Sequence, residues 1–141
     1  MVDDIDRAIL DELSRDSRLS FAEIGRLVNL SPSAVRERIL KMEESGLIKK
    51  YSVELDQKAL GNDLEVFILV NIFHGKLKGF LKMISKIPEI QRAYRITGNQ
   101  NIHLHAVLKD QLHLQNIIDE IMPYGDTTTM LILSDIFERE Y

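Results

Sequence analysis

Basic and small polar side chains gather in residues 15–50, where they could bind a polyanion. This segment holds eight basic and five acidic residues, although the chain of 141 residues carries a net charge of −4. Lysine and arginine neutralise phosphates, while guanidinium and hydroxyl groups can also hydrogen-bond base edges. Because the positive charge is local, it indicates a small contact with nucleic acid. The residues expected at this contact are Arg18, Ser31, Pro32, Ser33, Arg36, Glu37, Lys41, Lys49 and Lys50.

A second candidate for chemistry is the pair His103 and His105, which alternate in a predicted strand and project from one face. Two such side chains can bind a metal. However, the chain has no cysteine, no carboxylate lies at a recognised metal spacing, and His74 and His113 could help only if folding brings them near. We therefore expect polar interface histidines, with no metal and no cofactor.

Motifs of the common enzyme classes and of targeting are missing. The seven glycines form no G-x-G-x-x-G, and Gly75-x-x-x-Gly79 lacks the Walker lysine and hydroxyl residue. No G-x-S-x-G elbow and no acid/base pair of carboxylates stands out. The start of the chain resembles no signal peptide, and no run of about 18 apolar residues exists. We expect a cytoplasmic protein that is no enzyme and has no membrane partner.

Three short helices are expected to position the polyanion-binding side chains. An apolar stripe predicts a first helix over residues 4–14. Ser20 and Glu23 form the capping-box pattern that opens a second helix, and Asn29 suits its left-handed end. A tight link to a third helix favours a helix-turn-helix over residues 1–50. An ordinary three-helix packing unit with solvated charges fits the same pattern.

The third helix carries most of the candidate residues. Ser31 is a good N-cap, and Pro32 falls at the first helical position, where its missing N–H costs nothing. A major groove accepts one helix, whose N-terminal part reaches base edges. Arg38 lies close to the inward direction, so we expect it to form an ion pair with a carboxylate. The residues that must face inward are Val35, Ile39 and Met42.

After a polar connector over residues 51–63, the pattern alternates strands and helices up to residue 141. We expect strands over 64–73, 90–97, 101–108 and 127–137, with helices over 77–87 and 111–122. This order is that of a ferredoxin-like βαββαβ domain, so the fold class is α+β. Two helices cover one face of a four-stranded sheet, and the other face is also apolar. We therefore expect a second copy to cover it, as a homodimer.

The spaced pattern of the chain resembles the Lrp/AsnC family of leucine-responsive, or feast/famine, regulators. The matching stretches are Asp6-x-x-Ile9-Leu10-x-x-Leu13, Asp16-x-Arg18, Leu30-Ser31-x-Ser33-x-Val35-x-x-Arg38-Ile39-x-Lys41-Met42-Glu43-x-x-Gly46-Leu47-Ile48, Tyr51, Leu55-Asp56 and Leu60-Gly61. The resemblance continues through the second domain. It implies a transcription regulator that binds double-stranded DNA, dimerises through its C-terminal domain and often assembles into octamers. A metabolite-binding regulatory subunit that does not read DNA is the alternative.

The resemblance also implies a site for an amino-acid effector or related metabolite at the loop between the second and third strands. Gly98 matches the family's loop glycine, but Asn99, Gln100 and Asn101 stand where many members have a tyrosine-aspartate pair. If Asn101 replaces that aspartate, the site lacks a carboxylate for an ammonium group. No effector, or a different one, is the alternative. The other residues implied here begin the last strand: Thr127 and Thr129.

Overall fold

The computed structural model describes residues 1–139, so the last two residues of the predicted C-terminal domain lie outside the described part. The chain divides into two compact units. One contains Met1–Glu54 with the described residues from Ile136 onward, and the other is Leu55–Asp135. Each unit has its own hydrophobic core.

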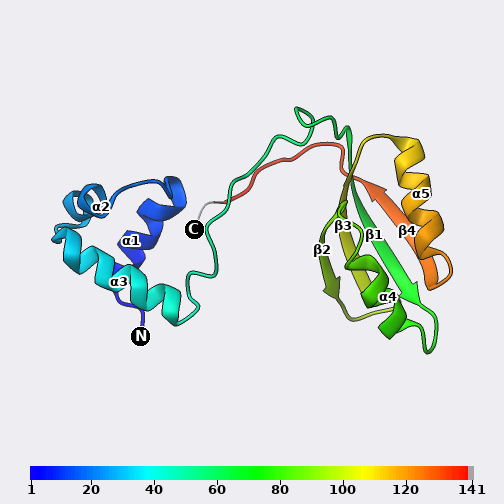
Figure 1. The fold of residues 1–141 in the computed structure, drawn as a ribbon, viewed down its shortest axis with the longest axis horizontal. Coiled ribbons are helices and arrows are strands. Elements are labelled where there is room, and N and C mark those ends of the chain that lie inside the picture. The colour runs from blue at the N-terminus through cyan, green and yellow to red at the C-terminus, as the bar shows by residue number, and fades with distance from the viewer. Residues whose placement is uncertain (140–141) are drawn as a thin grey trace. The chain divides into compact units, whose positions relative to one another are not determined.

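The first unit is built from three short helices, α1 (Asp4–Arg15), α2 (Phe21–Val28) and α3 (Pro32–Glu44) (Figure 1). A side-chain oxygen caps each one at its start, from Asp3, Ser20 and Ser31 respectively. The predicted capping box of Ser20 and Glu23 is confirmed. All three predicted inward residues of α3 are buried. The core of this unit consists of Ile9, Ile24, Val35, Ile39 and Met42.

The turn between α2 and α3 is short because two residues shape its backbone. Asn29 has a φ of 57°, the predicted left-handed end of α2. Leu30 then donates its backbone N–H to the carbonyl oxygen of Gly25 over 2.9 Å. A Cβ atom on Gly25 would lie 2.4 Å from the Leu30 oxygen, so only glycine fits.

The second unit is a four-stranded antiparallel sheet with two helices on one side. Its elements are β1 (Leu64–Ile72), α4 (Leu77–Ile84), β2 (Ile90–Arg95), β3 (Ile102–Leu108), α5 (Gln111–Ile121) and β4 (Gly125–Leu131). The strand order β2-β3-β1-β4 places the first and third strands at the centre. This is the predicted ferredoxin-like arrangement.

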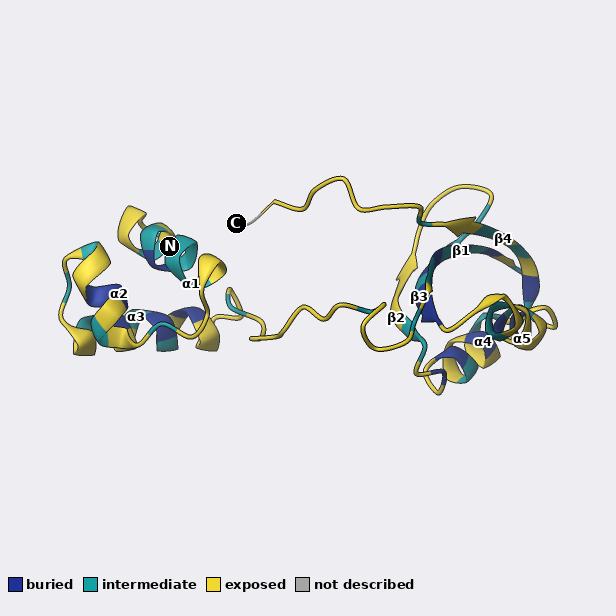
Figure 2. Cartoon of the chain, turned by 90° about the horizontal axis from the view of Figure 1, so that it is seen from above, coloured by how far each residue is buried: buried dark blue, intermediate teal, exposed yellow. Residues whose placement is uncertain are grey.

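The two faces of this sheet differ. In Figure 2 the sheet curves around α4 and α5, which cover one face. Val66, Ile68 and Val70 of β1 are buried in the core on that side. The alternate side chains of β1, among them Phe67 and Leu69, are only half-buried, because no element of this unit covers them. We call this second side the open face.

The last strand is shorter than predicted. The apolar alternation suggested a strand over residues 127–137, but β4 ends at Leu131. The last paired residues are Val66 of β1 and Leu131 of β4, and after them the Ile132 N–H still donates to the Glu65 oxygen over 2.9 Å. Beyond this point Leu133 is 92% exposed and Ile136 is 91% exposed. An apolar pattern alone therefore overestimated the length of the strand.

Candidate functional site

The N-terminal half of α3 presents polar side chains over a buried apolar side. Ser33, Arg36 and Glu37 are exposed, whereas Val35, 0% exposed, packs into the core. The Ser31 Oγ accepts the Ala34 N–H over 3.2 Å and lies 3.2 Å from the Ser33 Oγ. Thus the cap holds both hydroxyl groups at the start of the helix, beside Pro32. This end of α3 can offer hydrogen-bonding groups to a partner without disturbing the core.

Two predicted contact residues of α3 pair with each other. The Lys41 Nζ lies 3.0 Å from the Glu37 Oε1, one helical turn away. This contact with Lys41 lowers the pKa of the Glu37 carboxyl below its ordinary value. Both side chains remain about 70% exposed, so the ion pair is weak and solvent-screened.

Arg38 forms the ion pair that the sequence predicts, and it does so with two carboxylates. Its Nη1 donates to the Asp3 Oδ2 and the Asp6 Oδ1, both over 2.8 Å. The hydrogen bond from the Asp6 backbone N–H lowers the pKa of the Asp3 carboxyl most, and the Arg38 guanidinium lowers it further. Arg38 therefore fastens α3 to the start of α1 and is not free to read a base.

The remaining basic candidates lie outside the helices. Arg18 follows α1, where its backbone N–H is bonded to the Asp16 carboxylate over 2.9 Å. Lys49 and Lys50 follow α3, and all three basic side chains are exposed. Within residues 1–139 none of them forms an ion pair. They can therefore meet an anion without first breaking a salt bridge.

The loop between β2 and β3 is tied to two neighbouring strands. Gly98, within this loop, has a φ of 111°. The Asn101 Oδ1 accepts the backbone N–H of Ile72 in β1 over 3.1 Å. The Gln100 Nε2 donates to the Thr128 Oγ1 of β4 over 2.8 Å. The loop therefore reaches the middle of β4.

The structure brings the loop to Thr128, between the two threonines expected at the effector site. Thr127 and Thr129 pair with Val70 and Ile68, whose side chains are buried on the helix side of the sheet. Because side chains alternate along a strand, both threonines point to that side, away from the Thr128 side chain. Sequence reasoning missed Thr128, for which the run of three threonines gave no distinguishing signal.

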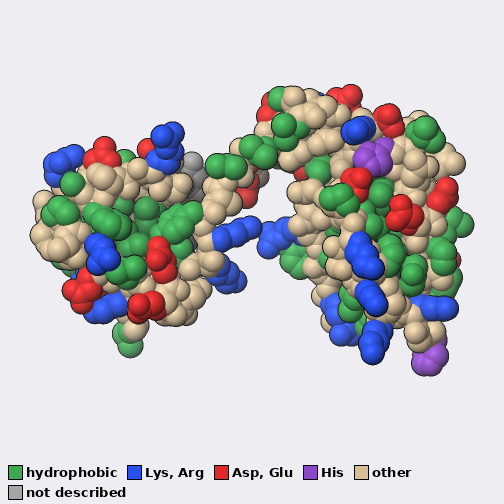
Figure 3. Space-filling view, viewed as in Figure 1, with side chains coloured by type: hydrophobic (Ala, Val, Ile, Leu, Met, Phe, Trp, Pro, Cys, Tyr) green, Lys and Arg blue, Asp and Glu red, His purple; other side chains and the backbone are tan. Residues whose placement is uncertain are grey.

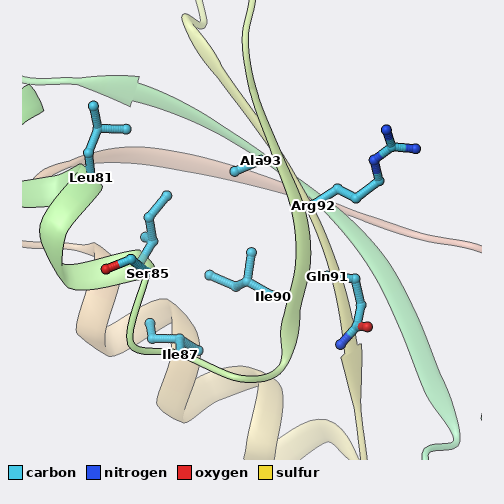
Figure 4. Close-up of a pocket in the computed structure, with 8 residues that line it drawn as sticks. Leu81, Ser85, Ile87, Ile90, Gln91, Arg92 and Ala93 are labelled. Atoms are coloured by element: carbon cyan, nitrogen blue, oxygen red, sulfur yellow. The ribbon is translucent and has the colours of Figure 1, made fainter. Parts of the chain in front are cut away.

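A separate apolar cavity of about 240 Å³ lies between α4 and β2. In Figure 4, Ile90 and Ala93 point from β2 toward the helix that carries Leu81. Arg92 points away from it. None of the predicted effector residues lines this cavity.

The two strand histidines lie on the open face. The rings of His103 and His105 lie 4.9 and 5.5 Å from that of Phe67, and the His105 Nε2 donates to the Glu65 Oε1 over 2.6 Å. His113, which a metal site would have needed nearby, bonds instead to Glu89 over 3.0 Å. Among the residues that the structure describes, no group of three or more His, Cys, Asp or Glu side chains could hold a metal ion.

Both units match known families of domains. Residues 2–43 match the AsnC-type helix-turn-helix domain, and residues 65–141 match the Lrp/AsnC ligand binding domain. The chain belongs to the Lrp/AsnC family of transcription regulators. This regulator is 36% identical to the HTH-type transcriptional regulator LrpC of Bacillus subtilis over 135 residues, which are 96% of this chain and 94% of LrpC.

Solved structures agree with this assignment. The structure of B. subtilis LrpC matches with a TM-score of 0.95 at 34% identity, and 99% of each chain is covered. Escherichia coli AsnC matches with a TM-score of 0.90 at 25% identity, over 100% of this chain and 98% of that chain. The regulator NMB0573 of Neisseria meningitidis, solved as an L-Met complex, matches with a TM-score of 0.91 at 25% identity, over 98% and 94% of the two chains.

Family membership decides between the functions that the sequence left open. This Lrp/AsnC protein is a transcription regulator with a helix-turn-helix and a ligand-binding domain, and not an enzyme. The alternative that the sequence left open, a metabolite-binding regulatory subunit that does not read DNA, is therefore rejected. Within residues 1–139 no helix combines the length and the apolar character that crossing a bilayer requires.

Proposed function

We propose that α3 enters the major groove of DNA. The observation that carries this proposal is the polar, exposed N-terminal half of α3 above a fully buried apolar side. A major groove about 12 Å wide admits one α-helix. The base-edge contacts come from Ser31, Pro32, Ser33, Arg36 and Glu37, and the phosphate contacts from Arg18, Lys41, Lys49 and Lys50.

The internal pair of Glu37 and Lys41 does not prevent these contacts. An exposed ion pair is worth about 0–1 kcal/mol, so Lys41 can leave Glu37 for a phosphate at little cost. Glu37 is then free to accept a hydrogen bond from a base amino group. Arg38 stays on Asp3 and Asp6 and keeps the helix in place.

The DNA-binding form that we propose is a homodimer joined through the open face of the sheet. Half-buried Phe67 and Leu69 and 41% exposed Met130 share this face, and a second copy of the same face would cover them. A two-fold dimer presents two α3 helices, which match successive major grooves when about 34–36 Å apart. An octamer would contain four such dimers. We place the protein in the cytoplasm, where it meets its DNA.

We propose further that an amino acid or related metabolite binds at Gly98, Asn99, Gln100 and Asn101 and at the segment of β4 from Thr127 to Thr129. The similar regulator of N. meningitidis was solved with L-methionine, which supports an amino acid here. In this chain Gln100 and Thr128 already hold each other across the sheet. A ligand that exchanges with this hydrogen bond would alter how the loop is tied to β4.

A mobility-shift titration tests the DNA contact, with the region upstream of the protein's own coding sequence and a random duplex of equal length. Arg36→Ala should lower affinity for the specific duplex by about 1–3 kcal/mol and affect the random duplex less. Arg15→Ala removes the same charge from α1 and should change neither. Equal losses on both duplexes would leave Arg36 as a phosphate contact. A wild-type protein that binds no duplex even at low salt would end the proposal.

A further inference from the structure

Helix α4 and the turns beside it carry a positive surface that the proposed function does not use. Residues 66–88 contain four lysines and no aspartate or glutamate. These lysines are exposed and form no ion pair within residues 1–139. Figure 3 shows Lys and Arg side chains gathered over the region of α4. We call this the α4 lysine patch: Lys76, Lys78, Lys82 and Lys86.

The patch does not serve the stability of its own helix. Lys78 and Lys82 lie four residues apart on α4, where like charges repel. Lys76 is the N-cap and makes no side-chain cap hydrogen bond, and cations are disfavoured at this end of a helix. The other four helices are all capped by a side chain. A segment that breaks local rules in this way is expected where function imposes a constraint.

Of the two helices that cover the sheet, only α4 carries basic residues. Its neighbour α5 lies on the same side of the sheet but contains no lysine or arginine, and it carries Asp119 and Glu120. Residues 51–141 as a whole hold nine basic and twelve acidic residues. Solvation of a helix surface therefore does not account for four unpaired lysines on one segment of an acidic domain.

We propose that the α4 lysine patch binds the phosphate backbone of DNA outside the duplex segment held by α3. This inference rests on the proposed function for the presence of DNA. The proposed dimer uses the open face, so the side that carries α4 stays outward. Lysines four residues apart on a helix are about 6 Å apart along its axis, and duplex DNA presents one charge per about 1.7 Å of its axis. Two lysines can therefore reach two phosphates whatever the base sequence.

The test measures how affinity depends on salt for the full-length protein on two random duplexes. One is about 20 base pairs long, enough for two helices one turn apart, and the other is about 150 base pairs, one persistence length. On the long duplex, the double variant Lys78→Gln/Lys82→Gln should lower the salt slope by about 1 for each lysine in contact. At 0.15 M salt this is roughly a fivefold loss of affinity for each contact. Binding to the short duplex should not change.

A matched control is Lys58→Gln/Lys109→Gln, which removes the same charge from two exposed positions of the same unit. It should leave both duplexes unaffected. Wild-type protein that binds the short duplex, with long-duplex binding indifferent to Lys78 and Lys82, overturns this inference and leaves the proposed function intact. Equal losses of affinity on the short and the long duplex also overturn it. So does a double variant that sediments as a smaller assembly than the wild type, because the patch would then hold copies of the protein together. Wild-type protein that binds neither duplex overturns both proposals.

Discussion

The backbone N–H of Leu30 donates to the carbonyl oxygen of Gly25 over 2.9 Å, so the turn before α3 lies directly against the α2 backbone. A Cβ atom on Gly25 would come within 2.4 Å of the Leu30 oxygen. Since that oxygen belongs to the backbone, no change of rotamer could relieve the contact. The angle at which α3 leaves α2 therefore depends on a glycine within a helix, where glycine is about 1 kcal/mol less favourable than alanine.

Gly25→Ala should destabilise the first unit by about 1–3 kcal/mol, as overpacking does, and weaken DNA binding with it. Gly79→Ala in α4 is the control, because its Cβ would meet only the movable Tyr124 ring at 3.4 Å. That variant should keep its stability within about 1 kcal/mol. Amide hydrogen exchange, followed separately in α2 and α4, measures the local stability around each of the two substitutions. Similar protection in the two variants would show that the α2–α3 turn tolerates a side chain at Gly25.

Acid should loosen the attachment of α1 to α3. The pKa of Asp3 in the folded protein lies below its ordinary value of 3.8. The stability that its charge contributes is therefore present above pH 3.8 and is lost as pH falls through the lowered pKa. Asp3→Asn keeps an N-cap oxygen but loses the ionic contact with Arg38. Helical circular dichroism during heating should show wild type more stable than Asp3→Asn near neutral pH and the two converging in acid. A constant difference down to the lowest pH would contradict this.

Much of the first unit could be predicted because its signals are local. The hydroxyl and carboxylate of Ser20 and Glu23, three residues apart, specify a helix start by themselves, and the inward residues of α3 follow from helical spacing. Gly25 was missed because the clash that requires it comes from the following turn, which a pattern within one helix does not report. A glycine in the middle of an otherwise good helix was the available signal.

The second unit shows where sequence patterns fail. Thr127, Thr128 and Thr129 look alike in the sequence, and only the register with β1 decides which of them meets Gln100. Likewise, Leu133 continues the apolar alternation of β4 although pairing with β1 ends at Leu131 and the Leu133 side chain is exposed. Alternation reports that a side chain avoids water, but it does not tell whether the same chain or another copy covers it.

Strong base should break the contact between the connector and α3. The Tyr51 hydroxyl donates to the Glu43 Oε1 over 2.8 Å. Burial, and then this carboxylate, raise the pKa of Tyr51 from 10.0 to about 12. The stability from neutral Tyr51 is thus fully present below pH 10.0 and is lost as pH rises through about 12. In a titration of tyrosinate absorbance, Tyr51→Phe should remove the last-ionising group, and Glu43→Gln should move it to lower pH. A curve unchanged by either variant would mean that the contact does not form in solution.

A charge on the open face should separate the proposed dimer. Phe67→Lys places an ammonium group between His103 and His105, where a partner sheet would have to bury it unpaired. Such burial costs several kcal/mol, so sedimentation velocity should show a monomer. Leu81→Lys, at a 40% exposed site on the opposite side, should stay dimeric. A dimeric Phe67→Lys variant would show that copies associate elsewhere.

The effector proposal can be tested by restoring a carboxylate to the loop. Asn101→Asp keeps the oxygen that accepts the Ile72 N–H and adds the negative charge that an ammonium group prefers. A hydrogen bond to a charged group contributes about 1.5–3 kcal/mol, so affinity for an amino acid should rise about tenfold or more. Calorimetric titration of both proteins with L-methionine measures this, and L-methionine methyl ester separates recognition of the ammonium group from recognition of the carboxylate. If the Asp variant binds neither compound more tightly than wild type does, the amino group does not lie at Asn101.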